Sequence, residues 1–149
     1  YVAVCAAVAG DDLRPDYSIE GLRWLARKAA EKTGVEPRFH AFEGDRGPAG
    51  ACAWLVEGGV ARVIGVTCAN GQVVAVVRAL ARLAYEAGAH TLEGRTDGHL
   101  GPALEGTGAR IAREGPWALV RANTCELRAA LESGRARASR FDGEWWTAF

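Results

Sequence analysis

The sequence predicts an α/β fold, with a mixed, twisted sheet, helices on both of its faces and a hairpin at the C-terminal end. The first observation is a pair of apolar stretches, Ala49–Glu57 and Val60–Cys68, joined by Gly58-Gly59, which is typical of a tight hairpin. The second is a long amphipathic segment, Val73–Ala87, that follows a short polar loop. The third is another strand, Ala89–Gly94, which we expect to run parallel to Val60–Cys68, because parallel strands need a crossover of this kind.

The N-terminal part of the chain contains one well-signalled helix. Tyr1–Val8 is apolar, and its pattern leaves both a strand and a helix end open. Ile19–Lys32 is expected to be a helix, since its apolar residues recur at helical spacing. Asp16 or Ser18 can cap its start, and Gly34 stands where a left-handed residue usually ends a helix.

The middle of the chain supplies the strands. Val35–Glu43 is a candidate strand, ended by the turn Gly44–Pro48. Val60–Cys68 is almost entirely apolar, as in a central strand covered on both faces, and Gly65 within it indicates a β-bulge. In Val73–Ala87 the apolar side chains fall on one helix face and the charged ones on the other.

The C-terminal third is expected to contain short elements. His99–Gly106 is at most a short helix, and Ala109–Ala122 reads as a hairpin around Gly115-Pro116. A capping box over Asn123–Glu126 predicts a further helix, with Asn123 as its N-cap. Arg137–Phe149 contains Asp142-Gly143 between two short strand-like runs, which predicts the terminal hairpin.

Composition narrows the class of protein. The 149 residues fit a single domain spanning 1–149, and the N-terminal Tyr with no Met anywhere indicates a piece of a longer chain. The net charge of zero argues against nucleic acid as a partner. No apolar run reaches the length of a membrane helix, so we expect no membrane partner either. Sixteen Arg against two Lys is typical of a GC-rich bacterial genome. Four scattered cysteines without a C-x-x-C pair suggest free thiols in the cytoplasm.

The order of elements from Leu13 to Ala122 resembles the GNAT superfamily of acyl-CoA-dependent N-acyltransferases. Three short patterns agree with it: Asp16-Tyr17 followed by Trp24-Leu25, the Gly-Gly-Val-Ala-Arg-Val run of Gly58–Val63, and the tail Ser139–Trp146. The tail resembles the C-terminal end of certain bacterial GNAT-like proteins that are often built from two such domains. The resemblance implies a sheet splayed at its centre and transfer of an acetyl or other acyl group from acyl-CoA to an amine.

The resemblance also implies where acyl-CoA, as co-substrate, would lie. Main-chain amides of the second apolar strand would orient the acyl carbonyl and stabilise the oxyanion, and those of the loop and helix start would hold the pyrophosphate. The residues concerned are Val66, Thr67 and Cys68 in the strand, and Asn70, Gly71, Gln72, Val73 and Val74 in the loop and helix start. The loop departs from the family pattern: Cys68 stands where Gln or Arg belongs, Val73 where Gly or Ala belongs, and no Arg or Lys lies between Arg62 and Arg78.

No catalytic residue is identified by the sequence, but three weak candidates exist. Many GNAT enzymes protonate the leaving thiolate with a Tyr, and the corresponding stretch Asp97–Leu104 has none, which leaves His99 as the candidate proton donor. Glu57, beside the hairpin turn, and Glu93, at a strand end, are candidates for the general base. The alternative for each of the three is a solvated surface side chain.

Cysteine and metal chemistry have weaker support. Cys68 precedes a helix N-terminus, whose dipole lowers a thiol pKa, so it is a candidate nucleophile; the alternative is a small buried apolar residue. His40, His90 and His99 lack metal-ligand spacing, and we expect no metal site.

Two functions therefore stay open. One is an N-acyltransferase-like domain whose acceptor is a small-molecule or peptide amine. The other is a catalytically silent GNAT-derived module that binds a second domain or a second copy of the chain, with Trp145-Trp146 available to cover an edge or meet a partner. An open, polar space between Val60–Cys68 and Ala89–Gly94 would favour the cofactor, and a space filled by side chains would favour the module.

Overall fold

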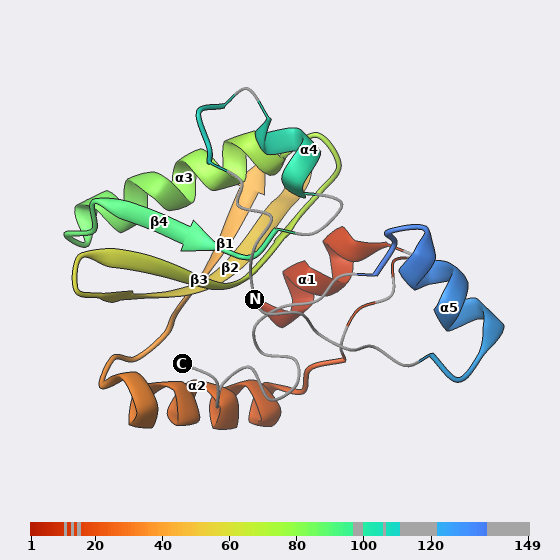
Figure 1. Cartoon of the computed structure of the whole chain (residues 1–149), viewed down its shortest axis with the longest axis horizontal. Coiled ribbons are helices and arrows are strands. Elements are labelled where there is room, and N and C mark those ends of the chain that lie inside the picture. The colour runs from red at the N-terminus through yellow and green to blue at the C-terminus, as the bar shows by residue number, and fades with distance from the viewer. Residues whose placement is uncertain are drawn as a thin grey trace.

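The structure, a computed structural model, describes residues 1–10, 12, 14, 16–96, 100–105, 107–110 and 122–136. Over these residues the protein is an α/β fold with a four-stranded, mixed, open sheet and five helices (Figure 1). The elements in chain order are α1 Val2–Ala9, α2 Ile19–Thr33, β1 Arg38–Gly44, β2 Gly47–Glu57, β3 Val60–Cys68, α3 Val73–Glu86, β4 Thr91–Gly94, α4 Leu100–Leu104 and α5 Cys125–Glu132.

The sheet has the strand order β1-β2-β3-β4. The β1–β2 and β2–β3 pairs are antiparallel, and the β3–β4 pair is parallel. Helix α3 is the crossover that makes the last pairing possible, as the strand–helix–strand order predicts. The predicted α/β class with a mixed sheet is confirmed.

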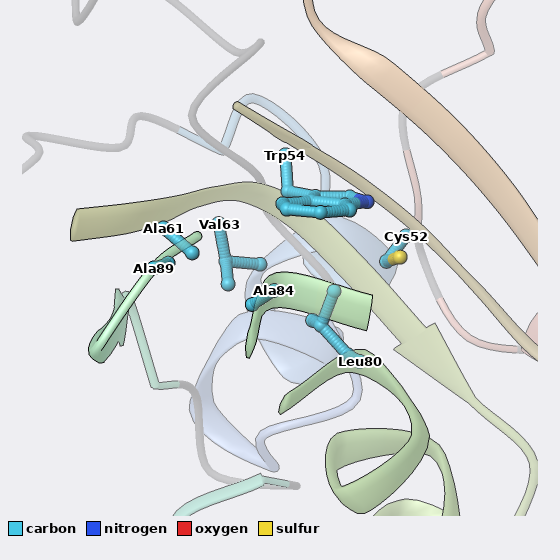
Figure 2. Packing of buried hydrophobic residues seen from close by; sticks show 7 residues of the cluster. All are labelled: Cys52, Trp54, Ala61, Val63, Leu80, Ala84 and Ala89. Atoms are coloured by element: carbon cyan, nitrogen blue, oxygen red, sulfur yellow. The ribbon is translucent and has the colours of Figure 1, made fainter. Parts of the chain in front are cut away.

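Helices cover both faces of the sheet, with α3 and α4 on one side and α1 and α2 on the other (Figure 1). On the α3 side, Leu80 and Ala84 pack against Trp54 and Val63 (Figure 2). On the opposite side, buried Leu22, Ala53, Leu55 and Ile64 form a cluster joined by partly buried Tyr1, Val2, Tyr17, Leu25 and Val35. The alternation of apolar side chains in β2 supplies both clusters, since neighbouring strand residues point to opposite faces.

The best-predicted elements carry their own boundary signals. Helix α2 begins after Ser18, whose hydroxyl accepts from the Gly21 N–H at 3.0 Å, and it ends at Gly34 with φ of 72°. Strand β3 and the start of α3 fall at the predicted residues, whereas α3 stops at Glu86, with Ala87 as its C-cap. The apolar N-terminal stretch, left open by the sequence, is helix α1.

Several predicted strand and helix boundaries are wrong for local reasons. The predicted turn Gly44–Pro48 is shorter, because β1 continues to Gly44 and β2 already starts at Gly47 instead of Ala49. Strand β1 starts at Arg38, because Pro37 has no N–H to donate to a strand partner. Strand β4 starts at Thr91, since the Ala89 N–H still bonds to the Ala84 carbonyl at 2.9 Å and so belongs to the end of α3.

The N-cap of α5 is Thr124 and not Asn123. Thr124 has the extended backbone of an N-cap, and its hydroxyl accepts from the Leu127 N–H at 3.3 Å. The predicted hairpins around Gly115-Pro116 and Asp142-Gly143 lie outside the described residues. None of the helices that the structure describes is long and apolar enough to cross a bilayer.

Candidate functional site

The central strand β3 contains a β-bulge at the place that Gly65 indicates. Ala53 of β2 pairs with Gly65, but the next β2 residue, Trp54, pairs with Val63, so Ile64 is an extra residue on β3. A bulge of this type breaks the two-residue alternation of the strand. The predicted bulge is therefore confirmed, with its extra residue beside the glycine.

The bulge sets which side chains of β3 face α3. Before it, Ala61 and Val63 pack in the cluster under α3, and after it Val66 and Cys68 continue the same row. Ile64 itself packs on the opposite face. If β3 paired with β2 without the bulge, the row would continue through Gly65 and Thr67, and a glycine and a hydroxyl side chain would lie beneath the helix in place of Val66 and Cys68.

The parallel ladder between β3 and β4 ends where the bulge begins. Its four rungs run from Val60 with Thr91 to Val63 with Gly94. Gly94 is needed at the last rung, because a Cβ there would lie 2.9 Å from the Cβ of Val63. Beyond this rung, no strand among the described residues pairs with Ile64–Cys68 on the side of β4.

The carboxyl half of β3 leads into a tight turn and then into α3. The Ala69 N–H bonds to the Ala49 carbonyl at 2.8 Å, and the Gln72 N–H bonds to the Ala69 carbonyl at 3.0 Å. Gly71 closes the turn with φ of 77°, a conformation that favours glycine. Helix α3 starts at its N-cap Gln72 with no side-chain hydrogen bond to its first N–H groups, whereas α2 and α5 each have one.

The predicted cofactor residues are brought together, with unequal exposure. Asn70 and Gly71 are exposed, and Val66, Thr67, Gln72 and Val74 are partly buried. Cys68 is 0% exposed and Val73 is 3% exposed. Burial of the whole Cys68 residue favours its packing role over that of a nucleophile that must reach a substrate.

Apolar side chains fill the junction of β3, α3 and α4. Leu100 of α4, 5% exposed, packs with Cys68, Val73, Val76 and Ala49 in one cluster. A phosphate could therefore approach the start of α3 only through the exposed turn and not through Val73. The loop adds no cationic side chain to the main-chain N–H groups of this turn.

The two candidate carboxylates lie on neighbouring strands and share one arginine. Arg62 of β3 has its Nη1 at 2.5 Å from Glu93 Oε1 on β4, with hydrogen-bond geometry. Its Nε lies 3.1 Å from Glu57 Oε2 on β2, close enough for an ion pair but without that geometry. All three side chains are partly exposed, at 34% for Arg62, 46% for Glu57 and 43% for Glu93.

The Arg62 group is separate from the turn before α3. Cys68 lies six positions after Arg62 along β3, which corresponds to about 20 Å at roughly 3.3 Å per strand residue. Glu93 is nevertheless next to Gly94, the last rung before the bulge. His99, the third catalytic candidate, lies outside the described residues.

Sequence reasoning missed a polar pair inside the α3-facing core. Trp54, 1% exposed, donates its indole N–H to Nδ1 of His40 at 3.0 Å. A signal did exist, since a buried tryptophan usually finds an acceptor for its N–H. Choosing His40 as that acceptor required the β1–β2 register, which pairs His40 with Cys52.

No group of three His, Cys, Asp or Glu side chains that could hold a metal ion is found among the described residues. Comparison with protein-family models gives no match. Searches of the curated proteins and of the solved structures give no significant match either.

Proposed function

We propose that this chain is a GNAT-like domain that binds acyl-CoA and transfers its acyl group to an amine. The observation that carries the proposal is the early end of the β3–β4 ladder at a bulge in β3. A strand that loses its neighbour and then feeds a helix start leaves main-chain groups for a ligand along its free side. The order of elements from α2 to α4 and the bulge in β3 support the proposal, because the resemblance rests on that order.

The residues would divide the work along β3. Main-chain N–H groups in the segment Asn70–Val74 would hold the pyrophosphate with the positive end of the α3 dipole. Gln72 would contribute little because its N–H bonds to the Ala69 carbonyl, and Val73 would contribute little because it is buried. Amides of Val66–Cys68 would orient the acyl carbonyl and stabilise negative charge on its oxygen. The amine nitrogen would attack the thioester carbon, the new C–N bond would replace the C–S bond, and the thiol would leave with the proton that the amine gives up.

A second function is favoured by a different observation. Leu100 and Val73 fill the junction beside the turn, and Arg62 pairs with both candidate carboxylates. These contacts support a catalytically silent module that keeps the fold and binds another domain or a second copy of the chain. The two functions differ in whether CoA is bound at all.

A thermal-shift titration with CoA and with acetyl-CoA tests the proposal. A ligand bound only by the native state stabilises it by RT ln(1 + [L]/Kd), about 2.7 kcal/mol at a hundredfold excess over Kd. We expect a rise of the melting temperature with both ligands. No shift at millimolar CoA would leave the silent module as the better account.

Asn70→Asp locates the site, with Asn123→Asp as its matched control. The first substitution places a carboxylate in the exposed turn before α3, where it should repel a pyrophosphate and weaken CoA binding about tenfold. The second makes the same change beside the start of α5 and should leave CoA binding unchanged. Equal CoA affinity for the two variants would argue against the turn as the pyrophosphate site.

A further inference from the structure

The hydrogen bond between His40 and Trp54 forms only when the imidazole can accept from the indole N–H, and it plays no part in the proposed function. Trp54 is the largest of the fully buried side chains among the described residues, and His40 belongs to β1, the strand at the edge of the sheet. The indole N–H lies 3.0 Å from Nδ1 of the imidazole, and the ring centroids are 5.8 Å apart. The bond therefore ties the edge strand to the core beneath α3, and Figure 2 shows Trp54 in that core.

Only one protonation state of His40 can make this bond. A neutral imidazole accepts at Nδ1 when its proton is on Nε2, whereas an imidazolium donates from both nitrogens. Protonation of Nδ1 would set two N–H donors against each other and leave the buried indole N–H of Trp54 without its acceptor. A buried donor that loses its partner is costly for the folded state.

The charged and titratable side chains around His40 come from β1, β2 and α3. Arg38, two residues before His40 on the same face of β1, places its guanidinium carbon 5.3 Å from the centre of the Trp54 ring. Cys52, which pairs with His40 across the β1–β2 ladder, carries no charge near neutral pH because burial raises the pKa of its thiol to about 12. The charged residues of α3 are exposed: Arg78, Arg82 and Glu86. Among the described residues of β1, β2 and α3, no carboxylate shares this buried face to balance a second positive charge.

We infer that the His40–Trp54 hydrogen bond is an acid-sensitive attachment of the edge strand β1 to the core. The bond holds while the imidazole is neutral and is lost when the imidazole is protonated. Histidine changes its charge between about pH 5 and 8, so the attachment responds within that range. Acid then loosens β1 and the environment of Trp54, while the β2–β3 hairpin and the turn before α3 keep their own contacts.

The test compares urea unfolding at pH 8 and at pH 5 for the wild-type chain and for His40→Gln. A glutamine carbonyl oxygen can accept from the indole and does not titrate. We expect the wild type to lose about fivefold or more of its folding equilibrium constant relative to His40→Gln over this interval, which is the cost of leaving a buried N–H donor without its acceptor.

His90→Gln is the matched control, because His90 is an exposed histidine whose contact is with Gly59 at the β2–β3 turn. It should leave the wild-type pH dependence unchanged. The indole ¹H–¹⁵N signal of Trp54, assigned through its loss in Trp54→Phe, should move between pH 8 and 5 in the wild type and stay in place in His40→Gln. An equal pH dependence of unfolding in wild type and His40→Gln, or a Trp54 signal that does not move in the wild type, would overturn the inference.

Discussion

Gly50 lies where β2, β3 and α3 come close together, and Gly50→Ala is expected to destabilise the fold. A Cβ at this position would lie 2.5 Å from the Thr67 carbonyl oxygen, 3.0 Å from Val76 Cγ2 and 3.3 Å from the Cα of Cys68. Two of these three neighbours are backbone atoms, which cannot rotate away. A single methyl group therefore has to push β3 away from β2 or α3 away from the sheet.

The size of the effect follows from these distances. Carbon and oxygen rest at about 3.3 Å or more in such contacts, so the two strands must separate locally by about 0.8 Å. Overpacking of this kind costs about 1–3 kcal/mol, against a gain of about 0.5–1 kcal/mol from the smaller backbone entropy of Ala. We expect a net loss of about 1 kcal/mol, and at most about 2.5 kcal/mol, in the free energy of unfolding.

Urea unfolding followed by circular dichroism measures this loss, with Gly101→Ala as the matched control. A Cβ at Gly101 in α4 meets no atom within 4 Å, so the control should leave stability unchanged or raise it. The reasoning would be refuted by a Gly50→Ala chain with the wild-type unfolding midpoint.

Two further predictions concern ionisable groups. Burial raises the pKa of Cys52 from 9.0 to about 12, so the folded state favours the neutral thiol. The contribution of the neutral thiol to folding stability is complete below pH 9 and is lost as the pH rises towards 12, at up to about 1.4 kcal/mol per pH unit. The urea midpoint of Cys52→Ala should therefore fall less at alkaline pH than that of the wild type. Arg62→Gln removes the shared cation of Glu57 and Glu93 and should cost about 1 kcal/mol or less, because these side chains are partly exposed. That loss should shrink at high salt, whereas Lys28→Gln, which breaks an exposed pair within α2, should change the urea midpoint little; a larger effect from the Lys28 variant would contradict the role given to Arg62.

The elements that the sequence predicts well are those whose boundaries are set by neighbours in the chain. Ser18 and Gly34 bound α2 through contacts only a few residues long, and Gly65 marks the bulge within its own strand. The α5 cap shows the limit of such signals. Asn123 and Thr124 are both good N-caps, and only the backbone conformation shows that Thr124 is the one used.

The contacts that the sequence does not predict depend on strand register. Arg62 meets Glu93 because β3 and β4 pair in parallel, and these residues are 31 positions apart in the chain. His40 meets Trp54 across 14 positions for the same kind of reason. No local pattern encodes either pair, since each depends on how two strands slide past one another.

The backbone of the candidate site was predictable from the sequence, but the side chains that pack over it were not. The sequence indicates a turn at Gly71 and a helix from Val73, and both are present. It does not indicate that Leu100 packs beside that turn, against Cys68 and Val73. No local pattern in the sequence sets where α4 lies relative to α3. The closed junction is therefore information that only the three-dimensional arrangement supplies.

The extra residue in β3 divides that strand into two segments with opposite rules for mutation. Up to Val63, odd-numbered positions need apolar side chains that fit beneath α3, and from Val66 onward even-numbered positions do. Deleting Ile64 would remove this change of parity and leave Val66 and Cys68 under the helix, whereas a strand that keeps Ile64 but pairs without the bulge would bring Thr67 there instead. A substitution scan of β3 should therefore show its sensitive positions change from odd to even within three residues, and a library built on uniform alternation would place polar residues in the core.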